Sequence, residues 1–212
     1  MKKIFSILLC VCFCPILLIG CSEPQKNAAD SVKAIYDLYI LGDTAGITSL
    51  GMTEEDITAA RQTYDNSLKE TIRSNFANSG QEIEEHVLDE LCEARKAALS
   101  KMKSSAEIVS ESEGRATVVI HTTYFKEAEL DADAFYAAKE AAQQNQFSSV
   151  EEQQVFLMNT YTQNLIEAYQ NVTPSEENTD ISVECVVQNN TWVPANMSSF
   201  GSDLALAVTG QN

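Results

Sequence analysis

The sequence predicts an α+β fold in which N-terminal helices pack on an antiparallel sheet of about four strands. Between residues 30 and 103, apolar side chains recur every three to four positions, which is the period of amphipathic helices. Two later stretches, 106–125 and 181–193, are rich in β-branched residues and are interrupted by short turns, which is typical of hairpins. Helices that precede and separate hairpins favour an α+β class.

The helices are expected in the following order. Asp30 is placed to cap the first helix and Gly42 to end it. Thr53 and Asp56 form the acidic variant of a capping box at the start of the second helix, which stops near residues 78–80. Four more helices are expected, at about 81–103, Asp131–Gln146, Ser148–Asn171 and 202–208, and Ser148 with Glu151 is expected to cap the third of these.

The strands are expected to form two hairpins. The segments 106–111 and 116–125 are joined by the turn Ser112-Glu113-Gly114. Residues 181–188 alternate as a strand, and the Asn189-Asn190 turn leads into a return strand that Pro194 stops.

The first twenty residues resemble an export signal. Lys2 and Lys3 are followed by an apolar run, 4–19, which is too short to cross a ~30 Å hydrocarbon core comfortably as a helix. The run ends in Leu18-Ile19-Gly20-Cys21, which resembles the lipobox of bacterial lipoproteins. The resemblance implies that a diacylglyceryl group is attached to the Cys21 thiol and that a signal peptidase cleaves between Gly20 and Cys21. An ordinary signal peptide or an anchor helix with an incidental cysteine is the alternative.

This interpretation divides the chain into a signal peptide (1–20), a lipidated tether (21–29) and a single α+β domain (30–212). The expected location is the cell membrane, lipid-anchored and facing outside the cytoplasm, or the outer membrane in a Gram-negative host. The full chain has 31 acidic and 14 basic residues, and two of the basic residues leave with the signal, so the mature chain has a net charge of −19. Nucleic acid is therefore excluded as an expected partner.

Several features together resemble bacterial lipoproteins of an uncharacterised domain-of-unknown-function family. They are the lipobox, a short tether, an early helix ending in Gly42-Asp43, an alternating strand and a turn leading into Trp192-Val193. That family is similar in turn to the cone-shaped sheet-and-helix fold of the nuclear-transport-factor and cystatin-like superfamilies. The resemblance implies a fold but no catalytic residue, since such folds host unrelated functions.

Few residues are candidates for catalysis. His86 is predicted on a helix with Glu82 and Glu90 one turn to either side, and His121 in the middle of a strand. His86 is expected to be solvated beside carboxylates. His121 is expected to be partly buried and hydrogen-bonded. The sequence lacks Gly-x-Ser-x-Gly, Walker A, dinucleotide-binding and His-Glu-x-x-His motifs. Asp131 and Asp133 do not continue into an EF-hand pattern, and no metal or cofactor is expected.

Cys92 and Cys185 remain after lipidation and cleavage, and they could form one disulfide outside the cytoplasm or stay as two buried core thiols. Trp192 is expected to pack across its hairpin against Val186 or Val187. The tyrosines could line a ligand pocket but are more often core residues.

The favoured function is a non-catalytic binding or interaction domain whose ligand, a protein or a small molecule, is unknown. The alternative is a cell-envelope hydrolase that uses His86 or His121 with carboxylates as general acid or base.

Overall fold

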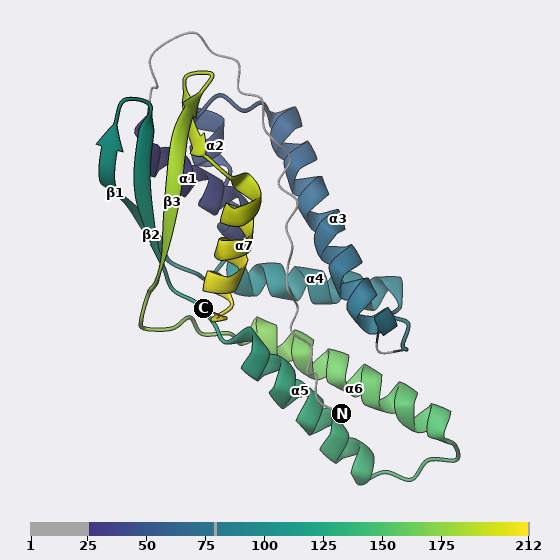
Figure 1. The fold of residues 1–212 in the computed structure, drawn as a ribbon. Coiled ribbons are helices and arrows are strands. Elements are labelled where there is room, and N and C mark those ends of the chain that lie inside the picture. Colours follow the sequence, from purple (N-terminus) through teal and green to yellow (C-terminus); the bar gives the residue numbers. More distant parts are fainter. Residues whose placement is uncertain (1–25, 79, 212) are drawn as a thin grey trace.

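The computed structural model describes residues 26–78 and 80–211. The predicted signal peptide, the predicted cleavage site between Gly20 and Cys21 and the predicted lipidation site at Cys21 lie outside the described residues. Within them the chain forms the α+β fold that the sequence predicts (Figure 1). The elements are α1 (Ala28–Tyr36), the π-helix η1 (Asp37–Leu41), α2 (Ala45–Ser49), α3 (Glu54–Asn78), α4 (Glu85–Leu99), β1 (Ser104–Ser112), β2 (Arg115–Thr122), α5 (Glu127–Gln143), α6 (Val150–Gln170), β3 (Thr179–Gln188), β4 (Thr191–Pro194) and α7 (Met197–Val208).

The first helix starts earlier than expected. The Asn27 side chain, and not that of Asp30, caps α1, because it accepts a hydrogen bond from the Asp30 backbone N–H at 2.8 Å. Ala28 and Ala29 are buried, so the apolar face begins before Asp30. The prediction that Gly42 ends this helical segment is confirmed, since Gly42 adopts a left-handed conformation with φ 76°.

Side-chain caps also begin two longer helices, α3 and α6. Thr53 caps α3 as expected, because its hydroxyl accepts from the Asp56 backbone N–H. The Asp56 carboxylate accepts from the Thr53 hydroxyl, whereas in a capping box it would accept from the Thr53 backbone N–H. At α6 the expected cap is wrong by one residue. Ser149 accepts from the Glu152 N–H, while Ser148 hydrogen-bonds the Glu152 carboxylate.

The four strands form one antiparallel sheet in the order β1-β2-β3-β4. The β3–β4 turn consists of Asn189 (φ 49°) and Asn190 (φ 64°), and two positive φ values match the twist of a two-residue hairpin. Gly114, also at positive φ, lies in the β1–β2 turn as predicted. The prediction for Trp192 is confirmed in its geometry, because Trp192 pairs with Val187 and is only 6% exposed.

One face of the sheet is covered by helices and the other faces solvent. Ala116, Val118 and Ile120 point inward from β2 and are buried. Helix α1 packs against β1, β2 and β4, and α7 packs against β3 and β4 (Figure 1). On the open face, alternate residues of β3 are exposed.

The remaining helices form a second packed region. Between β2 and β3 the chain makes the antiparallel pair α5–α6, which extends away from the sheet in Figure 1. Helix α4 packs on both α6 and α3. No helix among the described residues is long and apolar enough to cross a membrane.

Candidate functional site

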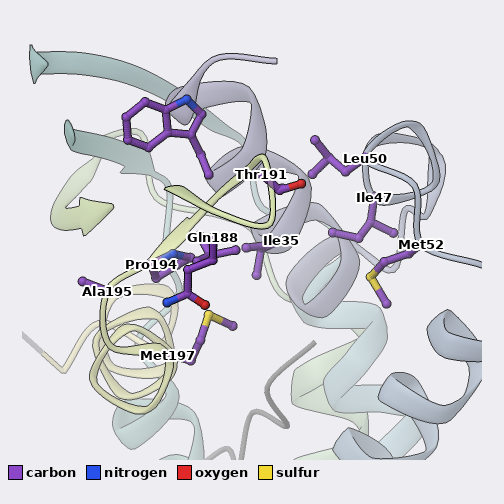
Figure 2. Close-up of a pocket in the computed structure, with 11 residues that line it drawn as sticks. Ile35, Ile47, Leu50, Met52, Gln188, Thr191, Pro194, Ala195 and Met197 are labelled. Carbon is purple, nitrogen blue, oxygen red and sulfur yellow. The ribbon is translucent and has the colours of Figure 1, made fainter. Parts of the chain in front are cut away.

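A pocket of about 220 Å³ lies between the α1–α2 corner and the β3–β4 hairpin. Figure 2 shows Ile47, Leu50 and Met52 on one side of it and Gln188, Pro194, Ala195 and Met197 on the other. The residues that line the pocket are Ile35, Ile47, Leu50, Met52, Gln188, Thr191, Trp192, Val193, Pro194, Ala195 and Met197.

Local sequence features place these walls. The left-handed turn at Gly42 redirects the chain from η1 into α2. Gly46 then lets α2 approach α1 closely, because a Cβ atom at this position would lie only 2.9 Å from the Ala34 Cβ. On the opposite side, Pro194 ends β4, and the Asn196 side chain caps α7 by accepting from the Ser199 N–H at 3.0 Å. The pocket therefore lies where the turn at Gly42 and the break between β4 and α7 bring segments that are distant in sequence together.

The lining of the pocket contains no charged side chain. Ile35, Ile47 and Met52 are buried in its wall, whereas the Gln188 amide and the Thr191 hydroxyl are the polar side-chain groups. Such a surface can bind apolar groups and form a few hydrogen bonds, but it offers no group for proton transfer.

A second hollow of about 450 Å³ lies at the base of the α5–α6 pair. It is lined by Tyr124, Lys126, Glu129 and Asp133 together with residues at the end of α6. Lys126 is paired there with Glu129 at 2.9 Å, and both side chains are largely exposed. We regard this hollow as a solvated surface depression.

His121 lies on the open face of the sheet, away from the pocket lining. Its Nδ1 is 2.6 Å from the Asp180 carboxylate on β3 and its Nε2 is 3.4 Å from the Glu107 carboxylate on β1. The hydrogen bond to Asp180, followed by that to Glu107, raises the pKa of His121. The expected hydrogen-bonded histidine is present, and the two acids hold it from opposite ring nitrogens.

His86 is an exposed residue on α4. Helix α4 begins only at Glu85, so Glu82 does not lie on the same helix and the expected three-residue face is wrong. The His86 ring instead lies 3.3 Å from the Glu84 carboxylate. Neither histidine lines either hollow. Among the described residues, no group of three or more histidine, cysteine or acidic side chains is placed to hold a metal ion.

A buried polar network joins α4, α5 and α6, and sequence reasoning missed it. Arg95 Nε donates to Glu127 Oε1 at 2.7 Å and Nη2 to Oε2 at 3.2 Å, and the Tyr169 hydroxyl donates to the same carboxylate at 2.7 Å. Next to this pair, the Tyr161 hydroxyl donates to Asp131, whose pKa burial raises to about 6. The signal was available, because Arg95 interrupts an otherwise apolar helix face.

Cys92 and Cys185 are free and buried, one on α4 and the other on β3. The structure thus contains the two core thiols of the alternative interpretation and does not contain the disulfide. Burial raises the pKa of Cys92 to about 11 and that of Cys185 to about 12, so neither is a thiolate near neutral pH.

Most tyrosines are core residues, as the sequence analysis favoured. Tyr36, Tyr39, Tyr64, Tyr161 and Tyr169 are buried. Tyr124 lines the second hollow, and Tyr136 is exposed on α5.

Comparison with known proteins identifies a family and a similar fold. Residues 23–201 match the sequence model of a family described as a domain of unknown function, DUF5105. The chain is also similar to a crystal structure from Bacillus subtilis subsp. subtilis str. 168 that is described as a "putative lipoprotein (ycdA)". The identity is 16% and the TM-score is 0.59, over 83% of this chain and 55% of that chain. The chain thus spans little more than half the length of that structure. No curated protein matches the sequence.

Proposed function

The chain belongs to the DUF5105 family of domains of unknown function, and from this premise we propose that it is a membrane-anchored bacterial lipoprotein with a binding role. In this proposal Cys21 carries the lipid, the folded domain lies outside the cytoplasm, and the domain binds a protein or small molecule without catalysing a reaction.

Two observations support the lipid anchor. The segment Leu18–Cys21 resembles a lipobox, and a protein of similar fold is described as a "putative lipoprotein". Helix α1 begins at Ala28, so only residues 22–27 separate Cys21 from the folded domain. Six residues span at most about 21 Å, which would keep the domain close to the bilayer surface.

The uncharged pocket is the observation that carries the binding role. Its lining provides apolar contact and two polar side chains, while the histidines lie on other surfaces. The hydrolase alternative has less support, since neither His86 nor His121 lines either of the two hollows described above.

We also propose that the sheet and α1 correspond to the cone-shaped fold of the nuclear-transport-factor and cystatin-like superfamilies. The packing of α1 across β1, β2 and β4 supports this relation. The α5–α6 pair would then be an insertion between two neighbouring strands.

The anchor is tested by metabolic labelling with a palmitate analogue in the host or a bacterial expression strain. Wild-type protein should be labelled and should sediment with membranes, because two or three acyl chains hold a protein almost irreversibly. The Cys21→Ala variant should be unlabelled and should leave the membrane fraction. Cys92→Ala is the matched control and should be labelled like wild type. Equal labelling of wild type and Cys21→Ala would show that the lipobox interpretation is wrong.

A further inference from the structure

The residues that line the pocket between the α1–α2 corner and the β3–β4 hairpin limit the chemistry of the molecules that can bind there. We propose that it binds a small uncharged molecule that is mainly apolar and carries one hydrogen-bonding group. This inference rests on the proposed binding role and names the chemistry of its ligand.

The size of the pocket limits the ligand. An apolar cavity of about 150 Å³ in a protein can hold a benzene molecule. A cavity of about 220 Å³ therefore suits a molecule with roughly eight to ten non-hydrogen atoms. A full-length membrane acyl chain is longer than this, so we infer a free small molecule and not the tail of a bilayer lipid.

The absence of charged side chains from the lining disfavours charged ligands. The pocket has no lysine, arginine, aspartate or glutamate in its wall, so a charged group held against it would lose part of its hydration without gaining a counter-charge. Apolar atoms gain free energy on the same transfer. The pocket should therefore discriminate strongly between an alcohol and the carboxylate or ammonium ion of equal chain length.

Two side chains can orient the ligand. In the part of the chain that the structure describes, the Gln188 amide and the Thr191 hydroxyl line the pocket and hydrogen-bond no other protein group. Both flank the Asn189-Asn190 turn and pair with each other across the β3–β4 hairpin, so their side chains start from the same face of the sheet. Figure 2 shows the Gln188 amide on the Met197 side of the pocket and the Thr191 hydroxyl on the Leu50 side, and either can hydrogen-bond a hydroxyl or carbonyl group of a bound molecule.

The test uses the mature chain, residues 21–212, with Cys21→Ser so that no lipid is attached. The probes are 1-octanol, octanoate and octylammonium at equal free concentration, and the readouts are the thermal midpoint and the emission of Trp192. Trp192 is the single tryptophan of the chain and lines the pocket, so its emission reports locally. We expect a saturable rise in the midpoint and a saturable emission change with 1-octanol, and affinity for either ion at least roughly tenfold weaker.

A pair of matched variants locates the binding. Leu50 and Leu157 are both half-buried leucines that pack against the core, but only Leu50 lines the pocket. Leu50→Asp should weaken 1-octanol binding by at least about tenfold by placing a charge in the pocket wall. Leu157→Asp should leave the affinity of the folded protein within about twofold. The three-probe comparison on the parent chain decides the matter if Leu50→Asp does not fold.

Three results would overturn the inference. They are the absence of a saturable response to 1-octanol, binding of octanoate or octylammonium as tight as that of 1-octanol, and equal binding by the two leucine variants. Phosphatidylcholine vesicles should not raise the midpoint, and a rise with vesicles in place of 1-octanol would indicate a bilayer ligand instead. These results are independent of the palmitate labelling, so failure of the ligand class and failure of the anchor are distinguishable.

Discussion

The Arg95 guanidinium is 1% exposed and is balanced by the Glu127 carboxylate in a two-bond contact. Replacing Arg95 with methionine would leave a carboxylate buried without a counter-charge. We expect Arg95→Met to lower the free energy of unfolding by about 3–5 kcal/mol, a large part of the ~5–15 kcal/mol that stabilises a typical domain. Urea denaturation at neutral pH measures this change.

The double variant Arg95→Met/Glu127→Gln separates the charge from the packing. It removes both charges, so it should be more stable than Arg95→Met alone, although the second substitution adds a change at another site. A single variant within about 0.5 kcal/mol of wild type would mean that the Arg95–Glu127 pair contributes little. If Arg95→Met does not fold at all, a folded double variant would still show that the unpaired charge, and not the loss of packing, causes the instability.

Strands β1, β2 and β3 are linked by a charge arrangement on the open face of the sheet. His121 lies between Glu107 and Asp180, and its raised pKa means that folding favours its protonated form. The stabilisation is fully present below the unfolded pKa of about 6.5 and is lost as pH rises through the folded pKa. We expect His121→Gln to reduce the urea midpoint more at about pH 5.5 than at about pH 9.

Comparing each variant with wild type at the same pH cancels the titration of the other carboxylates. His86→Gln is the matched control, because His86 is exposed and its ring is paired with the Glu84 carboxylate close to it in sequence and not across strands. Its effect should be small at both pH values. An equal effect of His121→Gln at low and high pH would show that the interstrand contact does not depend on charge.

The elements differ in how well the sequence predicts them. The helix from Thr53 to Asn78 and both hairpin turns are predictable because their signals are local: a capping threonine, Gly114 and two consecutive asparagines. The π-helix η1 and the short α2 are not, because five-residue segments contain too little periodicity. Their placement depends on tertiary contacts such as the close approach of Gly46 to Ala34.

The candidate site was less predictable than the fold. One wall comes from α1 and α2 and the other from the β3–β4 hairpin and α7, and more than 100 residues of chain lie between the two walls. No residue type in it has chemistry that stands out in a sequence, because an apolar pocket wall and an apolar core have the same composition. Arg95 was missed for a different reason, since a charged residue is expected at the surface unless its partner is known.

Across the whole molecule, stability should be distributed unevenly. The distal part of the α5–α6 pair, around residues 143–156, lies away from the sheet in Figure 1 and exposes Val150 and Val155. Strand β2 lies between two neighbours and buries every second side chain. We expect deuterium uptake at 143–156 to saturate at least about tenfold sooner than in β2, as hydrogen exchange with mass spectrometry would measure.

The expected difference in deuterium uptake reports local opening of the α5–α6 pair and not the global free energy of unfolding. Helix α6 near Tyr169 belongs to the same pair but is buried against α4, so it should exchange slowly and serves as the internal control. Uniform exchange along α5 and α6 would mean that the pair opens as a unit.

Two sulfur atoms make the pocket wall sensitive to oxidation. Met52 and Met197 contribute thioethers to an otherwise hydrocarbon surface. Peroxide converts a thioether to a sulfoxide, which is polar and accepts hydrogen bonds strongly, without altering the backbone. Peroxide treatment should therefore make the pocket wall more polar and weaken its binding of apolar molecules. Methionine sulfoxide reductase acts in the reverse direction, so reduction should restore the apolar wall.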